Sequence, residues 1–463
     1  MNNRYSDLIH QTFDFPQQGF KLKDNKLFFN DIDLSHLIKK YGTPLKLSYL
    51  PKISEQIQEA KRMFAKAFKQ HGYKADYNYC YCTKSSHFSF ILEEALKNNI
   101  HLETSFATDI EIIQRLYKRK KIDKTTKIIS NGFKTKTYTR KLSTLINEGF
   151  NVTPILDNKD EIKDYEKLVK TESCNIGIRI AAEEEPQFQF YTSRLGIRSR
   201  DIQSFYRDKI AENPKFKLKM LHFFINTGIK DDAYYWSELN KALNVYCELK
   251  KECADLDSIN IGGGFPIRNS LSFNYDYEYM ISEIVLQIKN ACKKAKVPVP
   301  HIYTEFGSYT VGESGAAIYK VLSQKWQNDQ ELWYMIDSSF ITTLPDTWGI
   351  GQKFIMLPVN GWDHEYHRVN LGGLTCDSHD YYNSEVHVSQ IYLPKIYNKE
   401  PLYIGFFHTG AYQESLSGYG GIKHCLVPAP KHILIQMDED GNITDKLFRR
   451  EQTAESMMKI LGY

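Results

Sequence analysis

Short apolar runs alternate with amphipathic segments from about residue 45 to residue 315. Eight of these runs have the length and the β-branched and aromatic content of strands. They are Ala75–Cys82, Ile100–Glu103, Lys127–Ser130, Val152–Asp157, Asn175–Ile180, Lys219–Ile225, Ser258–Ile261 and Ile302–Glu305. Segments between them have helical spacing of apolar residues, namely Ile53–Gln70, Leu142–Gly149, Trp236–Lys251 and Tyr279–Lys294. This alternation predicts a closed (β/α)8 barrel, with an open doubly wound sheet as the alternative.

The pattern changes after about residue 315, where short apolar runs are separated by turn residues and predict an antiparallel β domain. The runs are Ala317–Ser323, Glu331–Ile336, Lys353–Pro358, Ile391–Leu393, Leu402–His408 and Ile433–Asp438. The first 44 residues contain a strand, Lys26–Phe29, and a helix, Leu34–Tyr41, which ends at Gly42. The barrel has no place for this strand, so we expect two domains: a barrel of residues 45–315, and a β domain of residues 1–44 with 316–463.

Composition narrows the class of protein. Hydrophobic residues make up 42% of the chain and charged residues 25%, as in soluble globular proteins. The net charge of +4 is too small to indicate a nucleic-acid or membrane partner. The chain has no signal peptide pattern and no apolar stretch of about 18 residues, so we expect a cytoplasmic protein. The 8 cysteines contain no CxxC pair, which argues against disulfides and a zinc site and indicates a reducing compartment.

Distinctive residues lie where the predicted barrel strands end, which is the end of a barrel that carries the active site. Lys84 follows the first strand, Glu103 ends the second, and Glu305 closes the eighth. A single lysine at such a position is usually a solvated loop residue, but together these residues indicate a site. We therefore expect a lysine and acidic groups to face one another there.

The glycine turn Gly262–Gly264 follows the seventh strand directly. Glycine lets the backbone approach a ligand closely and point N–H groups at an anion, and this loop of a barrel is a frequent phosphate site. The turn matches neither a Walker loop nor GxGxxG. A simple tight turn is the alternative interpretation.

A phosphate site, a lysine and an acid together suggest pyridoxal 5'-phosphate. A lysine amine can hold the aldehyde of this cofactor covalently, and later exchange with a substrate amine. A carboxylate beside the pyridine nitrogen keeps that nitrogen protonated, so that the ring accepts electrons from the substrate α-carbon.

Several motifs of the chain resemble the fold-type III pyridoxal-phosphate decarboxylases, the group of ornithine, diaminopimelate and biosynthetic arginine decarboxylases. The motifs are Tyr41-Gly-Thr-Pro-Leu-Lys-Leu47, Tyr81-Cys-Thr-Lys84, Leu102-Glu-Thr-Ser105, Gly262–Gly264, Glu305-Phe-Gly307, Thr375-Cys-Asp-Ser378 and Gly410-Ala-Tyr412. They occur in the family's order over nearly the whole chain. The resemblance implies an alanine racemase-like barrel with a β domain.

The resemblance also implies cofactor-binding roles for individual residues. Lys84 would hold the cofactor, and Glu305 would face the pyridine nitrogen. The other cofactor-binding residues that it implies are Glu103, Arg179, Phe224, Thr227, Gly262, Gly263, Gly264, Gly307 and Tyr412. Phe224 stands where the family usually has a stacking histidine, and Ser308 where an arginine often follows.

Three later segments resemble biosynthetic arginine decarboxylases in particular: Leu344-Pro-Asp-Thr-Trp348, Leu374-Thr-Cys-Asp-Ser378 and the stretch from Gly405 to Glu414. They imply decarboxylation of L-arginine to agmatine and CO₂, a step of polyamine biosynthesis. Cys376 would reprotonate the α-carbon, and Asp377 would pair with the substrate guanidinium, with Asp346 as a second candidate. In this family the Cys-Asp loop reaches the partner's site, which implies a homodimer with shared active sites.

Other interpretations stay open at this point. The substrate can be another basic amino acid, namely ornithine, lysine or meso-diaminopimelate. A racemase of this fold would need a tyrosine base opposite the lysine. The changes at Phe224 and Ser308 also leave a non-catalytic pyridoxal-phosphate-binding protein as an alternative, and no motif supports a requirement for Mg²⁺.

Overall fold

The computed structural model describes residues 15–182, 193–386, 389–397 and 400–463. The chain divides into two compact units. The barrel unit comprises Ser54–Pro266 and Tyr275–Thr310, and the β unit comprises Met1–Ile53, Ile267–Asn274 and Val311–Tyr463.

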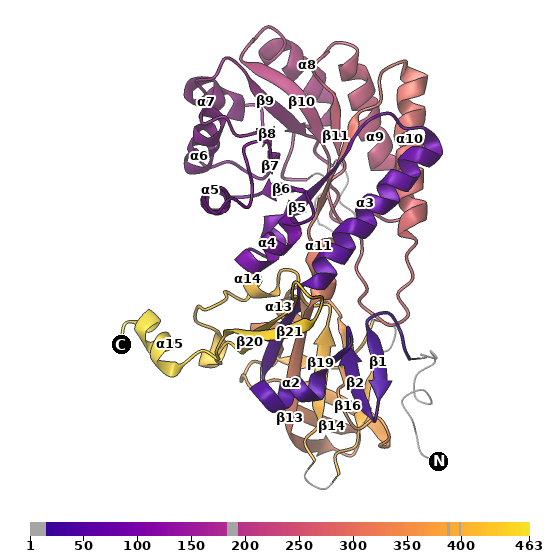
Figure 1. Cartoon of the computed structure of the whole chain (residues 1–463), viewed down its shortest axis with the longest axis vertical. Helices are drawn as coiled ribbons and strands as arrows, with labels where there is room; N and C mark the ends of the chain where they lie inside the picture. Colours follow the sequence, from indigo (N-terminus) through magenta and orange to yellow (C-terminus); the bar gives the residue numbers. More distant parts are fainter. Residues whose placement is uncertain (1–14, 183–192, 387–388, 398–399) are drawn as a thin grey trace. The chain divides into compact units, whose positions relative to one another are not determined.

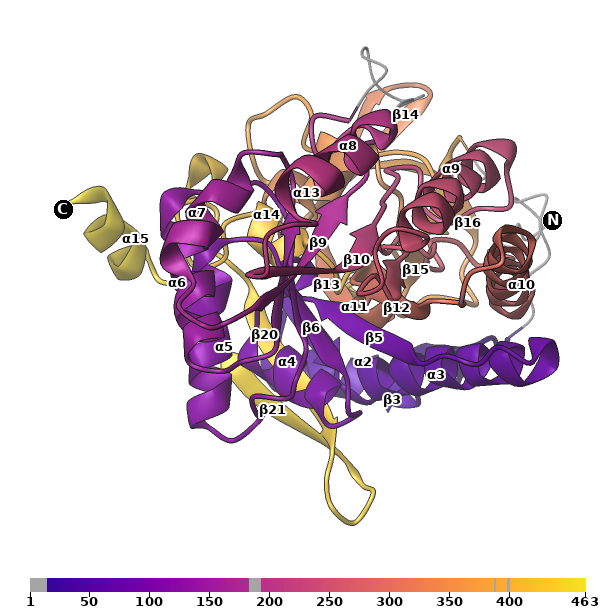
Figure 2. The same cartoon turned by 90° about the horizontal axis from the view of Figure 1, so that it is seen from above.

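The barrel unit contains eight parallel strands that close on themselves (Figures 1 and 2). In order around the barrel they are β10 (Phe216–His222), β11 (Ser258–Asn260), β12 (His301–Phe306), β5 (Tyr77–Cys82), β6 (His101–Thr104), β7 (Ile128–Ser130), β8 (Val152–Leu156) and β9 (Cys174–Arg179). The predicted barrel is therefore confirmed, and the open sheet is excluded because β9 pairs with β10.

Helices follow the strands and surround them on the outside (Figure 2). They are α3 (Pro51–His71), α4 (Ser89–Leu96), α5 (Ala107–Lys118), α6 (Lys136–Asn147), α7 (Glu161–Leu168), α8 (Ser199–Lys209), α9 (Ala233–Lys250) and α10 (Tyr277–Ala295). Asp232 and Asp276 cap α9 and α10 with their side chains, which satisfies backbone N–H groups at the helix starts. The four helical segments expected in this unit all occur.

Side chains fill the interior of the barrel. Cys80, Ile129, Ile155, Met220 and Tyr303 form one buried cluster, each from a different strand. A side chain at Gly177 on β9 would overlap this packing, because its Cβ would meet the end of Ile155 and the backbone of Met220. A small residue in β9 thus makes room for a large one in β8, as close packing of an interior requires.

One barrel strand differs from its expected range. The pattern predicts a strand over Lys219–Ile225, whereas β10 ends at His222. In the pairing register His222 lies opposite Asn260, the last residue of β11. Phe223 N still donates to Asn260 O, and at Gly262 the neighbouring segment leaves the extended conformation, with a φ of +68°.

The β unit contains a ten-stranded sheet with the main order β17-β16-β14-β13-β4-β20-β21. Strands β15, β18 and β19 pair beside this path. The strands are β4 (Leu45–Tyr49), β13 (Gly315–Asn328), β14 (Glu331–Ile336), β15 (Ile355–Pro358), β16 (Tyr366–Gly372), β17 (Tyr381–Tyr382), β18 (Ile391–Pro394), β19 (Tyr403–Phe407), β20 (Lys431–Met437) and β21 (Ile443–Arg449). Most pairs are antiparallel, and β4–β20 and β14–β16 are parallel.

The boundaries of the two units correct the expected ones. Leu45–Tyr49 was expected to begin the barrel, but it pairs with β13 and β20 inside the β unit. Its five residues are all buried, as in a central strand. The stretch Ile267–Asn274 also belongs to the β unit, although the sequence pattern gives no sign of this.

The N-terminal strands contact the rest of the β unit mainly through side-chain packing and less through strand pairing. Strands β1 (Phe20–Lys23), β2 (Lys26–Phe29) and β3 (Ile32–Asp33) form a separate three-stranded sheet. Phe20 and Phe29 pack on Phe407 with ring centroids 5.0 Å apart. Helix α2 (Leu34–Tyr41) follows, with Asp33 as its cap, and has the predicted bounds.

Four more short helices belong to the β unit within the described residues: α12 (Phe340–Thr343), α13 (Pro345–Gly349), α14 (Gln413–Leu416) and α15 (Ala454–Leu461). A further short helix, α11 (Ser308–Val311), begins in the barrel unit and ends at the first residue of the next β-unit segment. Among the described residues, no helix is long and apolar enough to cross a membrane.

Candidate active site

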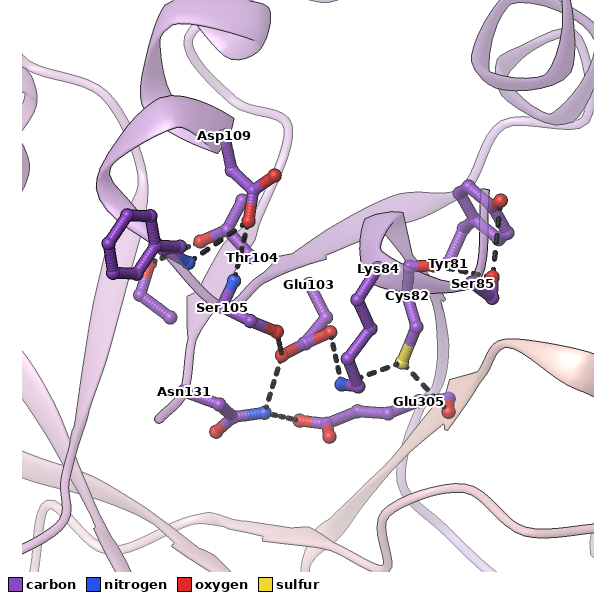
Figure 3. Close-up of polar contacts among 12 residues, drawn as sticks. Tyr81, Cys82, Lys84, Ser85, Glu103, Thr104, Ser105, Asp109, Asn131 and Glu305 are labelled. Carbon is purple, nitrogen blue, oxygen red and sulfur yellow. Dashed lines mark hydrogen bonds and ion pairs between the residues drawn. The ribbon is translucent and has the colours of Figure 1, made fainter. Parts of the chain in front are cut away.

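Lys84 lies in a short 3₁₀ turn, Thr83–Ser85, immediately after β5. The two cysteines before it, Cys80 and Cys82, are buried in the barrel. The Lys84 side chain is 43% exposed, and its Nζ lies 2.9 Å from Glu103 Oε2 and 3.7 Å from Cys82 Sγ (Figure 3). The two cysteines of β5 therefore pack inside the barrel, and the turn that follows presents a single amine at the barrel's carboxyl end.

Two buried carboxylates share one amide donor beside this amine. Asn131, just after β7, donates from Nδ2 to Glu103 Oε1 at 3.1 Å and to Glu305 Oε1 at 2.8 Å (Figure 3). Ser105 adds a hydrogen bond of 2.9 Å to Glu103. Lys84, Glu103, Asn131 and Glu305 thus form one connected polar network, contributed by four different strand ends.

Glu305, on β12, is held in its ionised form by its neighbours. Asn260 Nδ2 donates to Oε1 at 2.6 Å, and His222 Nε2 lies 3.3 Å from Oε2. Burial alone would raise the pKa of Glu305, but His222, Lys84 and Asn131 outweigh it and lower the pKa below the usual range for glutamate. The site therefore keeps a buried negative charge available to a cationic group.

The glycine turn after β11 passes directly beside Glu305. A Cβ at Gly263 would collide with the main-chain oxygen of Glu305, so no other residue fits there without movement. Gly262 and Gly264 have φ values of +68° and +108°, which L side chains rarely adopt. Gly307 is packed tightly but less closely, since its Cβ would lie 3.1 Å from Ser85 and 3.2 Å from Cys82.

The loop after β10 supplies further polar groups. Phe224 lies against Gly262, and the Arg179 guanidinium lies 5.9 Å from the centre of its ring. Phe224 is 37% exposed. Within the described ranges, Thr227 Oγ1 and the side-chain amide of Asn226 are buried atoms without a hydrogen-bond partner.

These residues fit pyridoxal phosphate. An amine at hydrogen-bonding distance from a carboxylate, a second ionised carboxylate, an open aromatic face and a glycine turn with unsatisfied polar atoms nearby are the groups that such a cofactor needs. Buried polar atoms without a partner cost free energy, which a bound phosphate or ring substituent would recover.

In the β unit, Asp346 and Tyr412 lie on neighbouring segments. Asp346 is in α13, and its Oδ2 accepts a hydrogen bond of 2.7 Å from Gln413, the residue after Tyr412. Burial raises the pKa of Asp346, and the bond from Gln413 partly offsets this. Tyr412 has a φ of +67°, which places it at a sharp turn before α14.

Cys376 and Asp377 lie on a separate loop of the same unit. The loop is tied down at its base, because Asp380 accepts hydrogen bonds from Thr375 N and Oγ1 at 3.1 and 2.7 Å. Cys376 is exposed, and Asp377 accepts a hydrogen bond of 2.8 Å from His379 N, which lowers its pKa. Cys376 contacts Cys425, whereas Asp346 bonds to Gln413, so these two candidates have different partners.

Three residues of the network were not among the residues proposed from the sequence: Asn131, Asn260 and His222. Asn131 and Asn260 had a detectable signal, since each is an amide at the end of an apolar strand. His222 is the last residue of β10, and its Nε2 lies 3.3 Å from Glu305 Oε2.

Comparison with known proteins gives one family. A family model described as pyridoxal-dependent decarboxylase, pyridoxal binding domain, matches residues 52–312, which is more than half of the chain. A biosynthetic arginine decarboxylase of Prochlorococcus marinus (strain AS9601) is 22% identical to the chain, over 94% of this chain and 85% of its own length.

Two solved structures show the same fold. The biosynthetic arginine decarboxylase from Campylobacter jejuni superposes with a TM-score of 0.81 and 22% identity, covering 96% of this chain and 89% of its own. The diaminopimelate decarboxylase from M. jannaschii gives a TM-score of 0.77 and 19% identity, covering 95% of this chain and 97% of its own. At these identities the structural likeness establishes the fold alone.

Proposed function

The chain belongs to the pyridoxal-dependent decarboxylases, and from this premise we propose that it converts L-arginine to agmatine and CO₂. The observation that carries the proposal is the network at the barrel's carboxyl end, where Lys84 Nζ lies 2.9 Å from Glu103 and Asn131 links Glu103 to Glu305. It presents an amine and an ionised acid together.

The barrel residues act on the cofactor and the reacting carbon. Bound pyridoxal phosphate supplies the electron sink that makes loss of an α-carboxylate feasible. Lys84 would hold the cofactor's aldehyde carbon and yield it to the substrate amine. Glu305, ionised by its surroundings, would keep the proton on the pyridine nitrogen, and Glu103 would hold the Lys84 amine in position.

The β-unit residues would act on the substrate. Cys376 would donate the proton that replaces CO₂ on the α-carbon. The neighbouring Cys425 raises the pKa of the Cys376 thiol, so the thiol carries a proton at neutral pH. Asp377 would pair with the guanidinium, and its lowered pKa keeps it charged.

Arginine is favoured by relatives named biosynthetic arginine decarboxylase and by the segment Leu344–Trp348. We further propose a cytoplasmic homodimer that serves polyamine biosynthesis, in which the loop of Cys376 and Asp377 completes the partner's site. Asp346 is the second candidate for the guanidinium, and its contact with Gln413 places it beside Tyr412.

CO₂ release from arginine, ornithine, lysine and meso-diaminopimelate tests the substrate, with Lys84→Ala as the inactive control. We expect kcat/KM for arginine to exceed that for each other amino acid by about a hundredfold, since an unpaired carboxylate penalises shorter or wrongly charged ends. Equal turnover of ornithine would overturn the choice of arginine. A yellow protein that releases no CO₂ from any of the four would favour a non-catalytic cofactor-binding role.

A further inference from the structure

Two segments of the β unit bring three metal-ligating side chains together. Cys376 lies on the loop after β16, and His424 and Cys425 lie in the 3₁₀ turn His424–Leu426. One ligand atom from each side chain lies within 4.8 Å of the other two. The two sulfur atoms are 3.5 Å apart and come from positions 49 residues apart in the sequence.

The distance between the two sulfur atoms suits a thiophilic cation. Two thiolates at about 2.3 Å from a tetrahedral Zn²⁺ are separated by about 3.8 Å, so the pair of Cys376 and Cys425 needs only a small opening to hold one. The imidazole of His424 would be the third protein ligand, and water can take the fourth coordination position. All three residues are exposed in the single chain.

The backbone around the cluster is fixed by contacts that the ligands do not make themselves. Asp380 holds Thr375, the residue before Cys376, through two hydrogen bonds. On the other segment, the buried Lys423 donates to the main-chain oxygens of Thr342 and Ser417 at 2.9 and 3.0 Å. The loop therefore presents its side chains from a fixed base.

Cys425 itself has a backbone conformation that requires explanation. Its φ is +53°, and the following Leu426 has the same value, although neither residue is glycine. Such a conformation costs of the order of 1 kcal/mol or more, and it persists where the surrounding structure imposes it. It turns the chain so that adjacent side chains, His424 and Cys425, both reach Cys376.

We propose that Cys376, His424 and Cys425 form a site for Zn²⁺ or a similar thiophilic divalent cation. Binding displaces the thiol protons of both cysteines to solvent and leaves one coordination position for water. The binding itself does not depend on the proposed function. Its consequence does: if Cys376 is the proton donor, a bound cation removes that proton and inhibits decarboxylation.

The direct test is zinc binding by the full-length protein, reduced with a phosphine and freed of metal. Titration against a chromophoric zinc indicator should give one ion per chain. Cys425→Ser and His424→Ala should each weaken binding at least about tenfold, whereas His36→Ala, which changes an exposed histidine on α2, should not. With Co²⁺ in place of zinc, a thiolate-to-metal absorption band should appear in the unmodified chain and disappear in Cys425→Ser.

Activity gives a second, separable measurement. Zinc should inhibit CO₂ release reversibly, with chelator restoring the rate, and Cys425→Ser should retain a larger fraction of its own zinc-free rate. Unchanged zinc affinity in Cys425→Ser, or a Cys376–Cys425 disulfide that persists under reduction and excludes zinc, would overturn the site. An inactive chain that still binds zinc through these residues would contradict the proposed function and leave the metal site standing.

Discussion

The candidate residues of the barrel unit and those of the β unit are held in different ways. In the barrel, Lys84, Glu103, Asn131 and Glu305 contact one another through hydrogen bonds, which are buried between Asn131 and the two carboxylates and part-buried at Lys84. In the β unit, Cys376 and Asp377 lie on a largely exposed loop, where Cys376 contacts the exposed Cys425 and Asp377 contacts His379 of the same loop.

This difference indicates what each unit can do alone. A buried network of fixed charges is organised before any ligand arrives, which is the condition for electrostatic stabilisation of a cofactor. Exposed residues on a loop gain their function only when a substrate or another subunit meets them. Cofactor binding and proton donation should therefore be separable by mutation.

The largest effect should come from Lys84. Lys84→Ala removes the amine, so the visible absorbance of the bound cofactor should disappear and CO₂ release should fall by roughly a thousandfold or more. Lys84→Arg is the matched variant, because it keeps the charge beside Glu103 but cannot form the covalent bond. A Lys84→Ala protein with full cofactor absorbance would break the assignment of the barrel site.

Cys376→Ala should distinguish the role of the β unit from that of the barrel unit. Loss of a proton donor typically costs about a hundredfold or more in rate, while the barrel network stays intact. We therefore expect a large fall in kcat with unchanged cofactor absorbance. Ser378→Ala, an exposed change on the same loop, is the control. If Cys376→Ala lost cofactor as well as activity, the proposed division between the units would be wrong.

A smaller effect should appear in the pH dependence of stability of the β unit. Burial lowers the pKa of His432 to about 4, and its Nε2 lies 2.9 Å from Ser48 Oγ. Lys46 adds to the lowering, while Glu414 opposes it. An unfolded histidine has a pKa of about 6.5, so the unfolded chain binds more protons between these values.

The stability that His432 contributes is therefore complete above about pH 6.5 and is lost as the pH falls toward 4. At pH 5 the loss is about 2 kcal/mol relative to pH 8. The melting temperature should differ less between pH 5 and pH 8 for His432→Gln than for the unmodified chain. His36→Gln, which changes an exposed histidine, is the control. An equal pH effect in His432→Gln and the unmodified chain would show that His432 is not held neutral by burial.

Much of the barrel could be predicted from the chain's pattern. All eight expected strands occur, because strands buried on both faces leave continuous apolar runs such as Val152–Leu156. In the β unit, β1, β3, β4, β16, β17 and β21 were not predicted. The last of these, Ile443–Arg449, is mostly exposed and carries charges, so it has no apolar run to detect.

The site was predictable where strand ends carry chemically distinctive residues, as at Lys84, Glu103 and Glu305. Asn131 and Asn260 were not among the residues proposed from the sequence, because an amide's role depends on which carboxylate lies within its reach. That distance is set by the closure of the barrel, which brings β7 and β11 to the same carboxylate on β12.

The local amino-acid sequence thus determined the alternation of strands and helices, the position of the glycine turn and the position of the lysine that follows β5. Tertiary structure alone decided the assignment of Leu45–Tyr49 to the β unit, the contact of His222 with Glu305, and the meeting of Cys376 with Cys425. The physical reason is the same in each case. Periodicity reports which side of an element is buried, whereas contacts between distant segments depend on how the chain closes in space.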